Sequence, residues 1–72
     1  MTAEEWIRAF AHKVGVTAPS QEEMDEILRL AGVAAHASER IAAPIACYLL
    51  GTSGRSLGDG LAAAEGIPGV TE

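Results

Sequence analysis

The residues that could carry chemistry are few and scattered. His36 and Glu39 are three positions apart and would share one face of a helix, while Cys47 lies further along the chain. A metal ion needs three or four ligands, and one pair with a distant thiol does not supply them. An activated cysteine needs a neighbouring base or cation, and no histidine adjoins Cys47 in sequence. We therefore expect no metal, no cofactor, no catalytic residue and no enzyme activity.

A second candidate is the short loop that follows the middle of the chain. Glycines, hydroxyls and one arginine before a helix start can hold an anion, which here would involve Ser53, Gly54, Arg55 and Ser56. The lysine and spacing of a P-loop are missing, and an ordinary turn between helices uses the same residue types. Binding of a small anion or nucleotide by loop 51–56 is therefore an alternative function.

Capping signals predict where the supporting helices begin. Thr2 with Glu5 and Ser20 with Glu23 have capping-box spacing. The first helix should cover 2–14 and end at Gly15, and a polar stripe that keeps its phase predicts a second helix over 20–40. The first helix carries an apolar stripe formed by Trp6, Ile7, Phe10 and Val14.

The second half of the chain predicts two shorter helices. Pro44 favours the first position of a helix over 44–50, with a possible extension to 53. Ser56 would cap a helix over 57–65, in which Gly58 and Gly60 each cost about 1 kcal/mol relative to alanine. The expected fold class is all-α, a small bundle of three helices plus a short weak fourth. It forms one domain over 1–66, followed by a mobile tail over 67–72.

The segment 41–54 contains no charged residue. A helix that is apolar all round must be covered, and 72 residues leave few elements to cover it. The helices over 2–14 and 20–40 each supply one apolar stripe. We expect one side to remain exposed and to contact another protein chain, either a second copy or a larger enzyme subunit, through Ile41, Ile45, Tyr48 and Leu49. The alternative is that the helix over 57–65 and the tail through Ile67 and Val70 cover it.

Composition narrows the possible partners. The net charge is −5. Most acidic residues lie at the expected starts of helices, where their negative charge interacts favourably with the positive end of the helix dipole. Five scattered basic residues form no patch for nucleic acid. No apolar run is long enough for a membrane span, and the acidic first residues do not resemble a signal peptide. A single cysteine is typical of a reducing compartment, so we expect a cytoplasmic protein.

Three polar residues precede the uncharged segment. His36, Glu39 and Arg40 permit two interpretations. They can tie the end of the second helix to nearby carbonyl or capping groups, because a cation is favourable there. They can also form a polar contact with a partner.

Several short motifs resemble those of a known family. They are Glu4-Glu5-Trp6, Ala35-His36, Glu39-Arg40 and the run over 42–51 from Ala-Ala-Pro to Tyr-Leu-Leu-Gly. The chain resembles a small, functionally uncharacterised all-helical domain family of actinobacteria. Members occur fused to, or encoded beside, molybdenum cofactor guanylyltransferases and formate dehydrogenase accessory proteins. The resemblance implies a non-enzymatic accessory or interaction subunit of such a molybdenum system. A self-associating helical protein is a further alternative.

Overall fold

The described part of the chain, residues 1–68 of a computed structural model, forms four α-helices and no strand. The helices are α1 (Ala3–Val14), α2 (Gln21–Ala37), α3 (Ala42–Ser53) and α4 (Leu57–Glu65). This confirms the all-α class. Residues 69–72, most of the segment expected to be a mobile tail, lie outside the described residues. No helix within residues 1–68 is both long enough and apolar enough to cross a membrane.

Hydroxyl caps begin three of the helices, as the sequence predicts. The Thr2 hydroxyl accepts a hydrogen bond from the Glu5 N–H at 3.1 Å, and the Glu5 carboxylate accepts from the Thr2 N–H at 2.8 Å. Ser20 and Glu23 repeat this reciprocal pair at the start of α2. At α4 the Ser56 hydroxyl accepts from the Asp59 N–H. These bonds satisfy amide groups that the helices themselves leave without a partner.

The boundary between α2 and α3 differs from the prediction. Helix α2 ends at Ala37 rather than near residue 40, and α3 begins at Ala42, two residues before Pro44. The carbonyls of Glu39 and Arg40 accept hydrogen bonds from the N–H groups of the first two residues of α3, at 2.9 and 3.2 Å. Pro44 is thus the third residue of α3, where a missing N–H also costs no helical bond. Its ring excludes a helix that continues through Arg40, since it would clash with that carbonyl.

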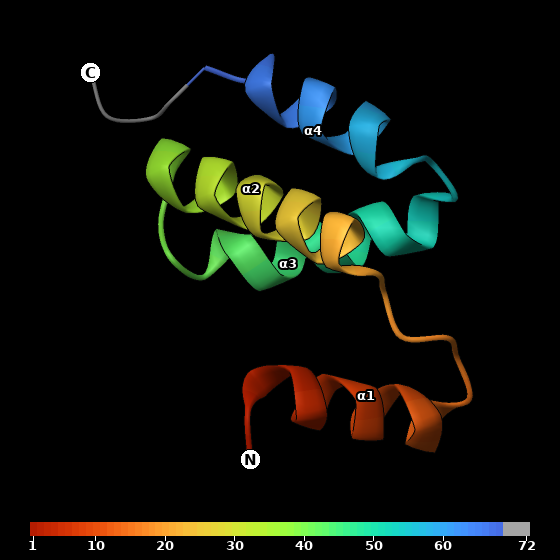
Figure 1. The fold of residues 1–72 in the computed structure, drawn as a ribbon. Helices are drawn as coiled ribbons and strands as arrows, with labels where there is room; N and C mark the ends of the chain where they lie inside the picture. The colour runs from red at the N-terminus through yellow and green to blue at the C-terminus, as the bar shows by residue number, and fades with distance from the viewer. Residues whose placement is uncertain (69–72) are drawn as a thin grey trace.

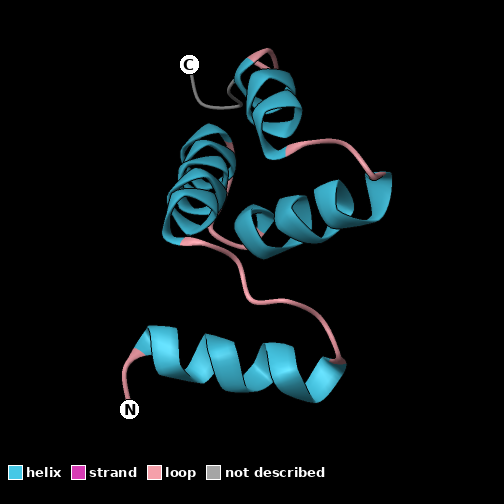
Figure 2. Cartoon of the chain, turned by 45° about the vertical axis from the view of Figure 1, so that its right-hand side comes forward, coloured by secondary structure: helices cyan, strands magenta, loops and turns pink. Residues whose placement is uncertain are grey.

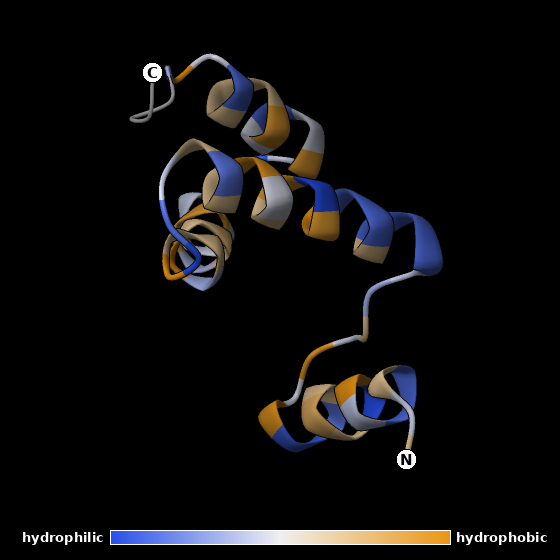
Figure 3. Ribbon diagram, turned by 90° about the vertical axis from the view of Figure 1, so that its left-hand side faces the viewer, coloured by the Kyte–Doolittle hydropathy of each residue, from blue (hydrophilic) through white to orange (hydrophobic). Residues whose placement is uncertain are grey.

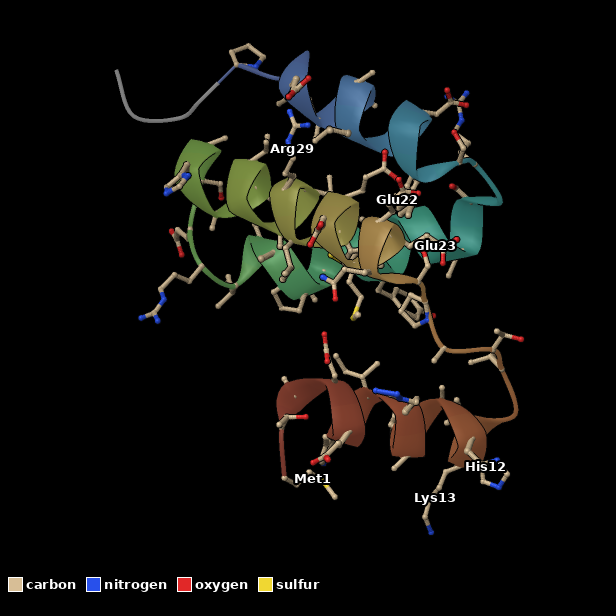
Figure 4. All side chains as sticks on the ribbon, viewed as in Figure 1. Met1, His12, Lys13, Glu22, Glu23 and Arg29 are labelled. Atoms are coloured by element: carbon tan, nitrogen blue, oxygen red, sulfur yellow. The ribbon has the colours of Figure 1, made fainter. Side chains whose placement is uncertain are left out.

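Helix α2 is the centre of the fold, with α3 packed against one side and α4 against another (Figure 1). Leu30 of α2 and Leu61 of α4 are buried, at 4% and 9% exposure. Arg29 points from α2 toward α4 and lies 3.6 Å from the Glu65 carboxylate (Figure 4). Both side chains of this pair are at least half exposed, so it contributes little beside the apolar contacts.

Gly60 of α4 is buried against the Leu50 side chain of α3. A Cβ built on Gly60 would overlap both methyl groups of Leu50 and lie 3.0 Å from its Cγ. At Gly58 the nearest atom, the Ser56 hydroxyl oxygen, is 4.0 Å away. The expectation that the two glycines weaken α4 equally is therefore wrong, because Gly60 creates the space that Leu50 fills.

Helix α1 stands apart from the other three and is joined to them by residues 15–20 (Figure 2). The helices that pack extensively are α2 with α3 and α2 with α4. Trp6, Phe10 and Val14 are 56%, 52% and 54% exposed. The expectation that this stripe helps to cover α3 is wrong. Gly15, with φ 81°, ends α1 and turns the chain into the connecting segment.

The detached helix gives the chain an open shape. The radius of gyration is 13.0 Å, whereas a compact chain of this length has about 11 Å. The accessible surface is 5586 Å², against about 4,200 Å² for a typical monomer of this mass. A larger share of apolar surface therefore faces solvent than in an ordinary small domain.

Candidate protein-interaction surface

One face of α3 is apolar and exposed. The α3 stripe consists of Ile41, the N-cap residue of the helix, and of Ile45, Tyr48 and Leu49 within it; the four side chains are between 58% and 72% exposed. Their spacing of four, three and one residues places them along one side of a helix. The α3 helix itself contains no charged residue. In Figure 3 the strongly hydrophilic colour appears on parts of α1, α2 and α4 and in the link before α3, whereas the α3 ribbon is pale or orange.

An apolar groove adjoins this stripe. Ile45 and Leu49 line it from α3, and Ile67 lines it from the segment after α4. The groove has a volume of about 290 Å³ and lies where α2, α3 and α4 meet. The other residues that line the groove are small, apart from Val33. They are Ala34, Ala37, Ser38, Ala42, Ala46 and Ala64. The small residues keep the groove open, so an apolar side chain from outside can enter it.

Helix α4 does not cover the α3 stripe. It packs on α2, and Ile67 just after it remains 66% exposed. Val70, the second residue expected to complete such a cover, lies outside the described residues. Among residues 1–68 the α3 stripe therefore presents its apolar surface to solvent.

The three polar residues before the stripe are all exposed. His36 is in the last turn of α2, while Glu39 and Arg40 lie in the link to α3. The backbone carbonyls of Glu39 and Arg40 hold the first turn of α3, as described above. Within the described residues, no side-chain hydrogen bond or ion pair involves any of the three. Glu39 and Arg40 directly precede Ile41 in the chain, so their side chains can contact a partner beside the α3 stripe.

The loop between α3 and α4 has its hydroxyls engaged within the chain. The Ser53 hydroxyl donates to the Leu50 carbonyl at 2.7 Å and accepts from the Arg55 N–H at 3.1 Å. Gly54, with φ 76°, is the left-handed residue that ends α3. Ser56 caps α4, whose first turn contains the carboxylate of Asp59. Anion binding by this loop stays a prediction, and no contact described here favours it.

The candidate metal ligands do not come together. No group of three or more His, Cys, Asp or Glu side chains within residues 1–68 could hold a metal ion. Cys47 is half-buried and lines a small hollow with apolar neighbours that include Ile27 and Leu30. His36 and Glu39 are exposed on α2 and on the following link.

A second exposed apolar face lies on α1, and the sequence pattern does not predict its exposure. Trp6, Phe10 and Val14 follow the ordinary spacing of a core-facing helix, and nothing in that spacing shows that the helix stays apart. The sequence feature that could have indicated the separation of α1 is the connecting segment. It contains Pro19 and Gly15, which adopts the left-handed conformation, and it joins two helices that each have their own cap.

These features define a small all-helical domain with exposed apolar faces on α1 and α3. A family model for a domain of unknown function, DUF6457, matches residues 1–70, and the chain belongs to this family. Comparison with curated proteins and with solved structures gives no match.

Proposed function

We propose that this chain is a non-enzymatic interaction module that docks on another protein through the α3 stripe. The observation that carries the proposal is the continuous, uncharged apolar face of α3, whose four large side chains are each more than half exposed. Isolated exposed apolar residues are common on proteins, but a contiguous group marks a binding surface.

The surroundings of the stripe have the anatomy of a protein interface. Tyr48 offers a large apolar area with a polar tip, a combination frequent at the centre of interfaces. The groove beside Ile45 and Leu49 can receive a side chain of the partner. His36, Glu39 and Arg40 are exposed and precede the stripe in the chain, and in this proposal they supply its polar edge. The partner surface that fits is apolar at its centre and carries polar or charged groups opposite this edge.

The identity of the partner is proposed from the family resemblance described above. The motifs from Glu4 to Gly51 resemble those of actinobacterial domains encoded beside or fused to molybdenum cofactor guanylyltransferases and formate dehydrogenase accessory proteins. The proposed partner is accordingly a subunit of a molybdenum-dependent oxidoreductase such as formate dehydrogenase, or a protein that matures its cofactor. The proposed location is the cytoplasm, because a single cysteine is typical of a reducing compartment.

Affinity capture with two matched variants tests this function. Tyr48→Glu places a charge in the α3 stripe, and Leu28→Glu makes the same kind of change at a 68% exposed position on α2. Wild type and Leu28→Glu should recover the same molybdenum-enzyme or maturation protein from native extract, and Tyr48→Glu should lose it. Circular dichroism checks that both variants remain folded. Recovery of the same partner by folded Tyr48→Glu would refute docking through α3, and recovery of unrelated proteins would refute the partner assignment.

A further inference from the structure

We infer that α1 is a hinged arm that closes onto α2, and that the open arrangement described above is one of two states in exchange. In the closed state Ile7 of α1 packs against Met24 and Leu28 of α2. The arm consists of residues 1–16, and it turns about residues 17–19. This inference goes beyond the proposed function because it concerns a movement within the chain and a face of α2 outside the α3 stripe.

Hydrogen bonds confine the hinge to three residues. The Val16 N–H donates to the Ala11 carbonyl at 3.0 Å, so Val16 moves with α1. Ser20 belongs to α2, because its hydroxyl accepts from the Glu23 N–H at 3.1 Å and its own N–H donates to the Glu23 carboxylate at 2.8 Å. Within the described part of the chain, no backbone hydrogen bond involves residues 17–19. A few link residues between two ordered ends are the usual anatomy of a hinge.

The arm can move as one body because both of its ends are formed within it. The capping box of Thr2 and Glu5 begins α1, and Gly15 ends it with N–H bonds to the Ala11 and His12 carbonyls. None of these bonds reaches α2, α3 or α4. A rotation about the hinge therefore breaks no hydrogen bond of the helix.

The arm and α2 already face each other across an open hollow. Ile7 lines it from α1 and Met24 lines it from α2, while Ala18 and Pro19 line it from the hinge. The hollow has a volume of about 370 Å³. Figures 1 and 2 show the separation of α1 from α2 and the link that joins them. Apolar side chains on the two sides of such a space lack the neighbours that close packing supplies, and closure of the arm provides them.

Leu28 extends the apolar face of α2 that the arm covers. It lies one turn after Met24, so both side chains are on the same side of the helix. Leu28 is 68% exposed, although it is a large apolar residue. Contact of Ile7 with these two residues removes apolar surface from water, which favours the closed state.

The composition of the hinge limits what closure costs in conformational freedom. Pro19 has a fixed φ angle, and Ala18 before it is restricted to extended conformations. Fewer backbone dihedrals are therefore free in the open state, and fewer are lost when the arm closes. The short link also keeps Ile7 near α2 at all times, which acts as a high effective concentration.

The first test is small-angle X-ray scattering, extrapolated to zero protein concentration. The open chain has a radius of gyration of 13.0 Å, and a compact chain of this length has about 11 Å. The wild type should give a value between these two. Leu28→Glu should raise it to that of the open chain, because the closed state would bury a charge. An equal radius in the wild type and in Leu28→Glu would overturn the inference.

Leu49→Glu is the matched control for the scattering experiment. It makes the same change at a leucine of α3 that is 58% exposed, and it should leave the radius of gyration at the wild-type value. Circular dichroism checks that both variants keep their helices. An increase in Leu49→Glu as large as that in Leu28→Glu would also overturn the inference, since the effect would not be specific to the face beside the arm.

The second test traps the closed state with a disulfide, in a Cys47→Ser background that removes the natural thiol. Ile7→Cys with Met24→Cys should cross-link within one chain under mild oxidation. Ala9→Cys with Met24→Cys is the control, because residues 7 and 9 point to opposite sides of a helix. The first pair should react about tenfold faster than the second, since only closure brings residue 7 to α2. Equal rates, or cross-links that join only separate chains, would overturn the inference.

These tests separate the inference from the proposed function. Leu28→Glu should lose closure and still capture the partner through α3, whereas Tyr48→Glu should lose the partner and keep the wild-type radius of gyration. Failure of one proposal is therefore visible while the other holds.

Discussion

Replacing Gly60 with alanine should destabilise this domain, although alanine is the better helix former. On propensity alone the change in α4 would stabilise the helix by about 1 kcal/mol. The new Cβ, however, would overlap both Leu50 methyls in the contact between α3 and α4. Inserting a carbon into a filled contact costs about 1–3 kcal/mol. The steric cost should exceed the gain in propensity and leave a net loss of stability.

Gly32 supplies the matched control. It lies in the middle of α2, and no heavy atom comes within 4 Å of a Cβ built there. Gly32→Ala should therefore stabilise the domain by about 1 kcal/mol. The two glycine-to-alanine variants should differ by about 1–3 kcal/mol, which measures the contact with Leu50 rather than helix propensity.

Urea unfolding followed by far-ultraviolet circular dichroism is the assay. A double variant, Gly60→Ala with Leu50→Ala, completes the cycle, because removing the Leu50 methyls removes the overlap. The double variant should be less destabilised than the sum of the two single changes. If Gly60→Ala stabilises as much as Gly32→Ala, the close approach of α4 to Leu50 is not a constraint and the reasoning is refuted.

Three further outcomes are expected. Ser20→Ala removes the cap of the longest helix and should lower the melting temperature by about 4–8 °C, from a loss of about 1 kcal/mol; an unchanged melt would show that the Ser20 cap adds nothing. Arg29→Ala should reduce the free energy of unfolding by less than about 1 kcal/mol, because the pair with Glu65 is exposed, and a larger loss in urea unfolding would contradict this. Protein purified without chelator should contain no stoichiometric zinc or iron by elemental analysis, and one tightly held ion per chain would contradict the absence of a ligand set.

Local signals in the sequence were sufficient to predict most of the helix boundaries. Thr2 with Glu5 and Ser20 with Glu23 form the capping boxes that their spacing predicts. Such bonds depend on residues three positions apart, so no knowledge of the fold is needed. The end of α2 was missed because its polar stripe keeps the helical phase past Ala37. Only the arrangement of the next helix, through the Glu39 and Arg40 carbonyls, shows where the chain turns.

The packing of the helices against one another was much harder to predict from the sequence. Periodicity identifies which side of a helix is apolar but not which element covers it, so the stripe of α1 was assigned to the core. The exposure of Tyr48 and Leu49 was anticipated because an uncharged segment in a short chain exceeds what its neighbours can cover. The packing role of Gly60 could not be predicted from the sequence. A glycine that only weakens a helix and a glycine that leaves space for a neighbouring side chain, here Leu50, are the same letter in the sequence.

The separation of α1 from the other helices also affects how unfolding of this chain is observed. A helix of 12 residues without extensive tertiary contacts is only marginally stable in water. Its amide protons should therefore exchange with solvent by local opening, at a lower free energy than those near Leu30 in α2. Trp6 reports only on α1, whereas far-ultraviolet circular dichroism is dominated by the other three helices. Melting curves from the two signals should not coincide, and a single two-state midpoint does not describe the whole molecule.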